Sequence, residues 1–117
     1  MVAEPERLSD DARALAQDPN QELLLSVAST WEIAIKHGIG KLGLPGRPED
    51  LIPQWMTRSA VQPLPVHHHH ALRVGRLPPH HRDPFDRLLI AQAQIEGTPI
   101  LTSDRVFQAY DVEVIAG

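Results

Sequence analysis

The sequence contains no cysteine in 117 residues, which excludes disulfide bonds, thiolate nucleophiles and thiolate-bound zinc. It also lacks long hydrophobic runs: the longest apolar stretches, such as residues 23–25, are far shorter than the roughly 20 residues that cross a bilayer. The first residues are acidic and have no apolar core, so no signal peptide is visible. We therefore expect a protein without a membrane span, located in the cytoplasm.

Positive and negative charges balance over most of the chain. The net charge of −4 comes from residues 1–22, which hold six acids and two arginines, whereas the remainder holds nine acids and nine lysines or arginines. The acidic total argues only weakly against a nucleic-acid partner, because phosphate binding depends on local patches. A hydrophobic share of 42% and a charged share of 22% are typical of a globular protein, and this length makes one domain, residues 1–117.

Short elements alternate along the chain, which eleven prolines and seven glycines interrupt. Apolar periodicity predicts helices at 8–16, 29–37, 48–59, 67–77, 84–96 and 106–110, and strands at 22–27, 61–66, 98–103 and 112–115. The strand at 61–66 contains two prolines, which favours an edge position. Strands that alternate with helices predict a parallel α/β sandwich.

One helix is specified at both ends. Asp83 is a good N-cap, Pro84 suits the first helical turn, and Gly97 is a typical terminator. We therefore assign Asp83 to capping, and only secondarily to a metal site.

Three acidic residues stand where the chain passes between predicted elements. Glu32 lies in the first turn after a strand, Asp86 in the first turn of a helix, and Asp104 directly after another strand. In an open α/β sheet the carboxyl ends of the strands face one edge, so these carboxylates could converge. Converging carboxylates repel one another unless a cation lies between them, and Mg²⁺ or Mn²⁺ prefers such oxygen ligands. The pattern indicates a metal site that activates water and holds a phosphate.

Each of these acids also has a structural interpretation. Glu32 can complete a capping box with Ser29, and it can pair with Lys36 one helical turn later. Asp86 is placed where the helix dipole favours negative charge, and Asp104 can cap the next helix. The sequence pattern alone leaves both interpretations open.

Histidines are the strongest composition signal, with a run at His67–His70 and a pair at His80 and His81. Imidazole is a good ligand for zinc or nickel, but four adjacent residues on a helix point in different directions, and only His67 and His70 have a metal-ligand spacing. We favour a solvated start of a helix over a metal site.

Arginines surround the histidine pair. Segment 67–87 holds four arginines and two acids, and Arg76, Arg82 and Arg87 could hold a phosphate backbone beside the acidic site. A few solvated arginines would give the same composition. The aromatic residues, Trp31 among them, occupy apolar helical positions that indicate core packing rather than base stacking.

Three blocks of the sequence resemble the PIN-domain family, most closely its VapC-like toxins. The blocks are STWEIAIK at 29–36 with GKL at 40–42, HHRDPFDRLLIAQA at 80–93, and LTSDR at 101–105. The resemblance implies a three-layer α/β/α sandwich with a small parallel sheet. It also implies an Mg²⁺- or Mn²⁺-dependent ribonuclease toxin that cleaves RNA, forms a homodimer and pairs with an antitoxin. By resemblance, the family's second, third and fourth acids correspond to Glu32, Asp86 with Asp83 close by, and Asp104.

The start of the chain departs from the family pattern. The family opens with an apolar strand that ends in Asp, whereas this chain starts at Met1-Val2-Ala3, inside the segment that follows that strand. The sequence therefore predicts a vacant central position in the sheet, no first metal-binding Asp, and a chain that folds poorly or associates through exposed strand edges. It also keeps two other functions open: a catalytically impaired PIN-like module that binds antitoxin or RNA, and a histidine-rich metal carrier.

Overall fold

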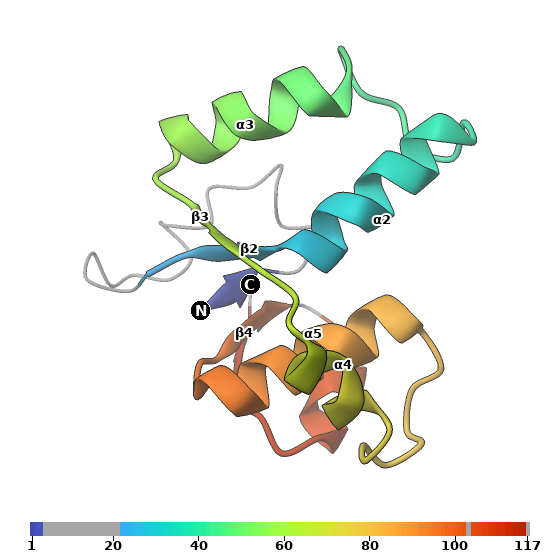
Figure 1. Cartoon of the computed structure of the whole chain (residues 1–117), viewed down its shortest axis with the longest axis vertical. Coiled ribbons are helices and arrows are strands. Elements are labelled where there is room, and N and C mark those ends of the chain that lie inside the picture. Colours follow the sequence, from blue (N-terminus) through green and yellow to red (C-terminus); the bar gives the residue numbers. More distant parts are fainter. Residues whose placement is uncertain (4–21, 103, 117) are drawn as a thin grey trace.

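In the computed structural model, which describes residues 1–3, 22–102 and 104–116, a five-stranded sheet lies between two sets of helices (Figure 1). All pairings are parallel in the order β3-β2-β1-β4-β5, formed by β1 (Val2–Ala3), β2 (Leu24–Ser26), β3 (Gln62–Leu64), β4 (Ile100–Thr102) and β5 (Val114–Ala116). The helices are α2 (Val27–Gly38), α3 (Pro48–Arg58), α4 (His68–Val74), α5 (Pro84–Glu96) and the 3₁₀ helix η2 (Arg105–Ala109). The predicted α/β/α sandwich with a small parallel sheet is confirmed.

Alternate strand residues point to opposite faces of the sheet, and a different helix covers each face. On one face Leu25 and Leu101 pack with Trp55 of α3. On the other face Ile100 packs with Ile90 of α5. The buried apolar side chains on both faces hold the sheet between the two helical layers, so the loops at the carboxyl ends of the strands are free to carry polar residues.

The central position of the sheet is occupied, so the expectation of a vacant position is wrong. β1 lies between β2 and β4, with Val2 opposite Leu24 on one side and Ile100 on the other. The backbone N–H of Val2 donates to the Pro99 carbonyl at 2.8 Å, and that of Leu24 donates to the Met1 carbonyl at 2.8 Å. Sequence reasoning missed this strand because three apolar residues are too few to show a strand period.

Helix α2 begins earlier than predicted, because strand β2 leads directly into it. Its N-cap is Ser26, whose Oγ accepts a hydrogen bond from the Ala28 backbone N–H at 3.1 Å. Ser29 is therefore inside the helix and buried, and the predicted capping box of Ser29 with Glu32 is wrong. The shift frees Glu32 from any capping role.

Helix α5 has both predicted caps. Asp83 Oδ1 accepts from the Phe85 backbone N–H at 2.9 Å, and Pro84 is the first helical residue. Gly97 ends the helix in the left-handed conformation, with φ 63°. The proline-containing strand, β3, lies at an edge of the sheet as predicted.

The remaining boundaries differ from the predicted ones by a few residues. The helix predicted at 67–77 is observed as α4, and the strand predicted at 98–103 is observed as β4. The helix predicted at 8–16 lies outside the described residues. Among the helices that the structure describes, none combines the length and the hydrophobicity that a membrane span needs.

Candidate functional site

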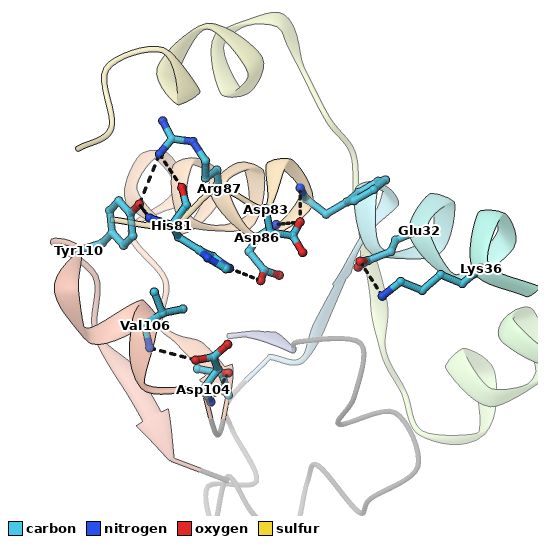
Figure 2. A network of polar contacts seen from close by, with 11 residues as sticks. Glu32, Lys36, His81, Asp83, Asp86, Arg87, Asp104, Val106 and Tyr110 are labelled. Atoms are coloured by element: carbon cyan, nitrogen blue, oxygen red, sulfur yellow. Dashed lines mark hydrogen bonds and ion pairs between the residues drawn. The ribbon is translucent and has the colours of Figure 1, made fainter. Parts of the chain in front are cut away.

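Asp86 lies in the first turn of α5, and its carboxylate points into a space that Glu32 and Asp104 also face (Figure 2). Asp83 accepts hydrogen bonds from the backbone N–H groups of Phe85 at 2.9 Å and Asp86 at 3.3 Å. Asp83 is the N-cap of α5, so the carboxylate of Asp86 is not needed for capping and can make contacts outside the helix. One of its oxygens, Oδ2, lies 2.7 Å from Nε2 of His81.

The surroundings of Asp86 disfavour its charged form. Burial is the main reason that its pKa rises to about 6, and the negative charges of Asp83 and Glu32 raise it further. The hydrogen bond and the charge of His81 act in the opposite direction and lower this pKa. A partly buried carboxylate that feels the charges of two further acids is an arrangement that a cation would stabilise.

Glu32 belongs to the buried face of α2 and is only 7% exposed. Its Oε2 lies 3.0 Å from Nζ of Lys36, which confirms the predicted pair one helical turn apart. Its negative charge contributes to the raised pKa of Asp86, although the two carboxylates come from different helices. The side chain of Lys36 is about half exposed.

Asp104 follows β4 and is exposed. Its Oδ1 accepts from the Val106 backbone N–H at 3.0 Å, so the predicted capping role is confirmed. Its own backbone N–H donates to Oγ1 of Thr102 at 3.0 Å, which fixes the turn that carries it. In Figure 2 its carboxylate is directed toward the side of Asp86, at the carboxyl edge of the sheet.

A group of possible metal ligands surrounds Asp86. One ligand atom each from His81, Asp83 and Asp86 lies within 4.8 Å of the other two. Glu32 adds a buried carboxylate, and one helical turn before it the buried Oγ of Ser29 has no hydrogen-bond partner among the described residues. Oxygen donors in this number fit a hard divalent cation such as Mg²⁺ or Mn²⁺.

His81 is the site residue that sequence reasoning missed. His81 lies in the loop before α5, so its separation of five residues from Asp86 follows no helical spacing and gave no signal. The pair of histidines at 80 and 81 was visible, but which of them contacts Asp86 depends on the path of that loop.

The sequence led us to expect that Arg87 contacts a phosphate, but in the structure its guanidinium group donates to backbone carbonyls. Its Nη1 donates to the carbonyls of Pro78 at 3.0 Å and His81 at 3.2 Å, and its Nη2 donates to those of Val74 at 3.0 Å and Leu77 at 3.4 Å. The guanidinium group thus holds the chain between α4 and α5 together. Arg76 and Arg82, in contrast, are exposed.

The histidine run is only partly solvated, because the ring of His70 is fully buried at 0% exposure. Its Nδ1 accepts from the backbone N–H of His67 at 2.9 Å, and its Nε2 lies 2.8 Å from Oε1 of Glu96. Nδ1 acts as the acceptor, so Nε2 carries the proton and donates to Glu96. His69, His70 and Glu96 are close enough to share an ion. A metal bound to Nε2 of His70 would require a proton on Nδ1, and that proton would face the His67 N–H that now donates to Nδ1. His70 is therefore a structural residue, and the solvated interpretation holds for residues 67–69, which are exposed.

Comparison with known sequences gives one curated relative at substantial identity. The chain is 44% identical over 68 residues to Ribonuclease VapC16 of Mycobacterium tuberculosis, a match that covers 55% of this chain and 48% of that protein. The chain therefore spans about half the length of this curated relative.

Two solved structures share the fold. "Structure of FitAB bound to IR36 DNA fragment" aligns with a TM-score of 0.69 and 18% identity, over 98% of this chain and 93% of that one. FitAcB from Neisseria gonorrhoeae aligns with a TM-score of 0.63 and 17% identity, over 97% and 95% of the two chains. The PIN domain model matches residues 1–113. With nearly the whole sequence matched and the sandwich in place, the chain belongs to the PIN-domain family.

Proposed function

We propose that this chain is a metal-dependent endoribonuclease, the toxin component of a type II toxin–antitoxin system, which hydrolyses RNA phosphodiester bonds in the cytoplasm. The observation that carries the proposal is the cluster around Asp86, whose largely buried side chain lies within 4.8 Å of ligand atoms of His81 and Asp83. Burial and the charges of Asp83 and Glu32 raise the pKa of Asp86 to about 6, as expected for acids gathered at a cation site. Membership of the PIN-domain family and the similarity to a relative named as a ribonuclease support it.

In this proposal the carboxylates of Glu32, Asp86 and Asp104 hold one Mg²⁺ or Mn²⁺ ion, and Asp83 is the less favoured ligand because it caps α5. The bound ion would supply a Lewis acid that activates water and stabilises negative charge on the phosphate. Glu32 and Asp86 are held by two different helices, so the site has the rigid support that a fixed ligand geometry requires. Burial strengthens the electrostatic effect of both groups.

RNA binding is assigned to Arg76 and Arg82. Both side chains are exposed and lie in the segment that leads from α4 to α5, the helix that carries Asp86. Exposed guanidinium groups contact phosphates without sequence preference and release counterions. Arg87 contributes by fixing the shape of this segment rather than by touching RNA.

The purified chain should cleave single-stranded RNA when Mg²⁺ or Mn²⁺ is added, and Glu32→Gln should abolish the cleavage. Glutamine keeps the size of the side chain but removes the charge that holds the cation, so we expect a loss of roughly 100-fold or more. The measurement is the initial rate of RNA cleavage on a denaturing gel. Glu113→Gln, at an exposed position in the segment between η2 and β5, is the matched control and should leave the rate unchanged.

The same experiment separates this function from its main alternative. A catalytically impaired PIN-like module would retard RNA on a native gel without cleaving it, with or without the added ion. A histidine-rich metal carrier would bind zinc or nickel through residues 67–70, but the two hydrogen bonds of His70 argue against that function.

Helix α2 offers a surface for the antitoxin. Val27, Trp31, Ile35 and Ile39 follow one another at a spacing of four along α2 and its C-cap, and all four are exposed. Trp31 is 61% exposed, so the expectation that it belongs to the core is wrong; its ring meets Phe85 edge-on at 5.4 Å. An exposed apolar stripe of this kind marks a protein-binding surface. We propose that the antitoxin covers it and that the chain forms a homodimer through another surface.

Ile39→Glu should weaken the complex with the product of an adjacent small gene by at least about tenfold, because a charge placed within an apolar interface is unfavourable. Ile39 is 61% exposed, so the variant should fold normally. The measurement is the dissociation constant by calorimetry, with Gln54→Glu on the exposed side of α3 as the control. If Ile39→Glu instead dissociates the homodimer and leaves antitoxin binding unchanged, the stripe is the dimer interface and the assignment is wrong.

A further inference from the structure

His81 makes the only hydrogen bond that the described residues give to the carboxylate of Asp86 (Figure 2). Its Nε2 lies 2.7 Å from Oδ2, and both side chains are largely buried. A carboxylate with one oxygen engaged cannot rotate freely. The described residues provide no hydrogen bond to the other oxygen, Oδ1.

The position of His81 is fixed through its backbone. Its N–H donates to the hydroxyl of Tyr110 at 2.9 Å, and its carbonyl accepts from Nη1 of Arg87 at 3.2 Å. Its ring meets the buried Phe107 edge-on, with the ring centres 6.4 Å apart. The ring thus has little freedom to turn away from Asp86.

Tyr110 joins this loop to the carboxyl-terminal part of the chain. Its hydroxyl donates to the Pro78 carbonyl at 2.9 Å and accepts from the His81 N–H and, at 3.4 Å, from Nη1 of Arg87. One donor and two acceptor positions are all that a hydroxyl has, so its capacity is used in full. The same segment begins at Asp104, so the network ties the loop before α5 to a second candidate ligand.

We infer that His81 is a positioning residue, which holds Oδ2 of Asp86 so that Oδ1 faces the ion. The inference rests on the proposed function, since it assigns a role within the same site. Nε2 donates its proton to Oδ2, so it is engaged as a hydrogen-bond donor rather than as a metal ligand. The network of Tyr110 and Arg87 keeps His81 in place.

The test compares His81→Phe with His81→Gln in Mn²⁺ binding, measured by calorimetry and by electron paramagnetic resonance. Phenylalanine fills the space of the ring but donates no hydrogen bond, so the dissociation constant for Mn²⁺ should rise by roughly 10- to 100-fold. Glutamine places an N–H at a similar reach and should restore the affinity to within about threefold of the wild type. His68→Phe, the same change at an exposed position on α4, is the control and should bind normally.

RNA kinetics and a second variant complete the design. His81→Phe should lower kcat and leave KM for RNA unchanged, because the arginines that we assign to RNA are untouched. Tyr110→Phe removes the hydroxyl but keeps the ring packed, and should weaken Mn²⁺ binding less than His81→Phe does, because Arg87 still holds the loop. Melting curves without metal show whether each variant folds.

The outcomes separate the two proposals. If the wild type binds no Mn²⁺, the proposed function fails and this inference fails with it. If the wild type binds Mn²⁺ and His81→Phe, folded, binds it within about twofold, only the positioning role is overturned. Loss of binding in both His81→Phe and His81→Gln would make His81 a direct ligand, which also overturns the positioning role.

Discussion

Replacing Asp86 with asparagine should abolish RNA cleavage and the stabilisation by Mn²⁺ while making the metal-free protein more stable. Burial and the neighbouring charges of Asp83 and Glu32 raise the pKa of Asp86, so its charged form is unfavourable in the folded protein at neutral pH. Asparagine is neutral and can still accept from His81. We expect the melting temperature without metal to rise, and the rate of cleavage to fall by roughly 100- to 1000-fold.

Thermal melts with and without Mn²⁺, together with cleavage rates, check this expectation. Asp111→Asn, at an exposed position, is the matched control and should change neither the melting temperature nor the rate. A lower metal-free melting temperature in Asp86→Asn would mean that the carboxylate stabilises the fold, which contradicts the expectation that its buried charge is unfavourable. An unchanged rate of cleavage in Asp86→Asn would mean that Asp86 is not part of the catalytic site.

The pH dependence of wild-type stability tests, without a mutation, whether the charged form of Asp86 destabilises the metal-free fold. Between the ordinary value of 3.8 and about 6, the folded state binds a proton at Asp86 that the unfolded state has released. The contribution of Asp86 to metal-free stability is therefore greatest below pH 3.8 and is lost as the pH rises through about 6. Mn²⁺ competes with that proton, so its affinity should rise over the same interval, and Asp86→Asn should lack this dependence in stability.

Local signals in the sequence were reliable where one short segment decides the structure. The caps of α5 depend on Asp83, Pro84 and Gly97 alone, and all three behave as predicted. The pair of Glu32 and Lys36 follows from helical spacing, which any correct helix assignment preserves. The choice of Glu32, Asp86 and Asp104 as site residues rests on their place at the ends of elements, and it stays a prediction.

Features that depend on distant segments could not be predicted in this way. The contact of His81 with Asp86 needs a loop path that Tyr110 fixes from 29 residues away. The sequence presents Arg87 as a free charge, because its carbonyl partners in Val74 and Pro78 approach it only through the path of the chain from α4 to α5. The start of α2 was misplaced since Ser26 and Ser29 are equally good caps by sequence, and only the end of β2 decides between them.

The second large effect is expected in the central strand, β1. Val2→Asp should unfold the protein or remove most of its free energy of unfolding. The side chain of Val2 is 0% exposed and packs with Leu64 of β3 and Leu89 of α5. An unpaired carboxylate buried there should destabilise the fold by about 3–5 kcal/mol, against a total stability of roughly 5–15 kcal/mol for a small domain. The measurement is the free energy of unfolding in urea.

Val27→Asp provides the matched control, because the same substitution falls on an exposed residue in the first turn of α2. A negative charge at a helix N-terminus is mildly favourable, so this variant should be as stable as the wild type. Val2→Ile should also fold, since it keeps an apolar branched side chain in the same place. A Val2→Asp protein within about 1 kcal/mol of the wild type would show that β1 does not fill the centre of the sheet. The edges of β2 and β4 would then be open, as the sequence first led us to expect, and the chain should associate through them.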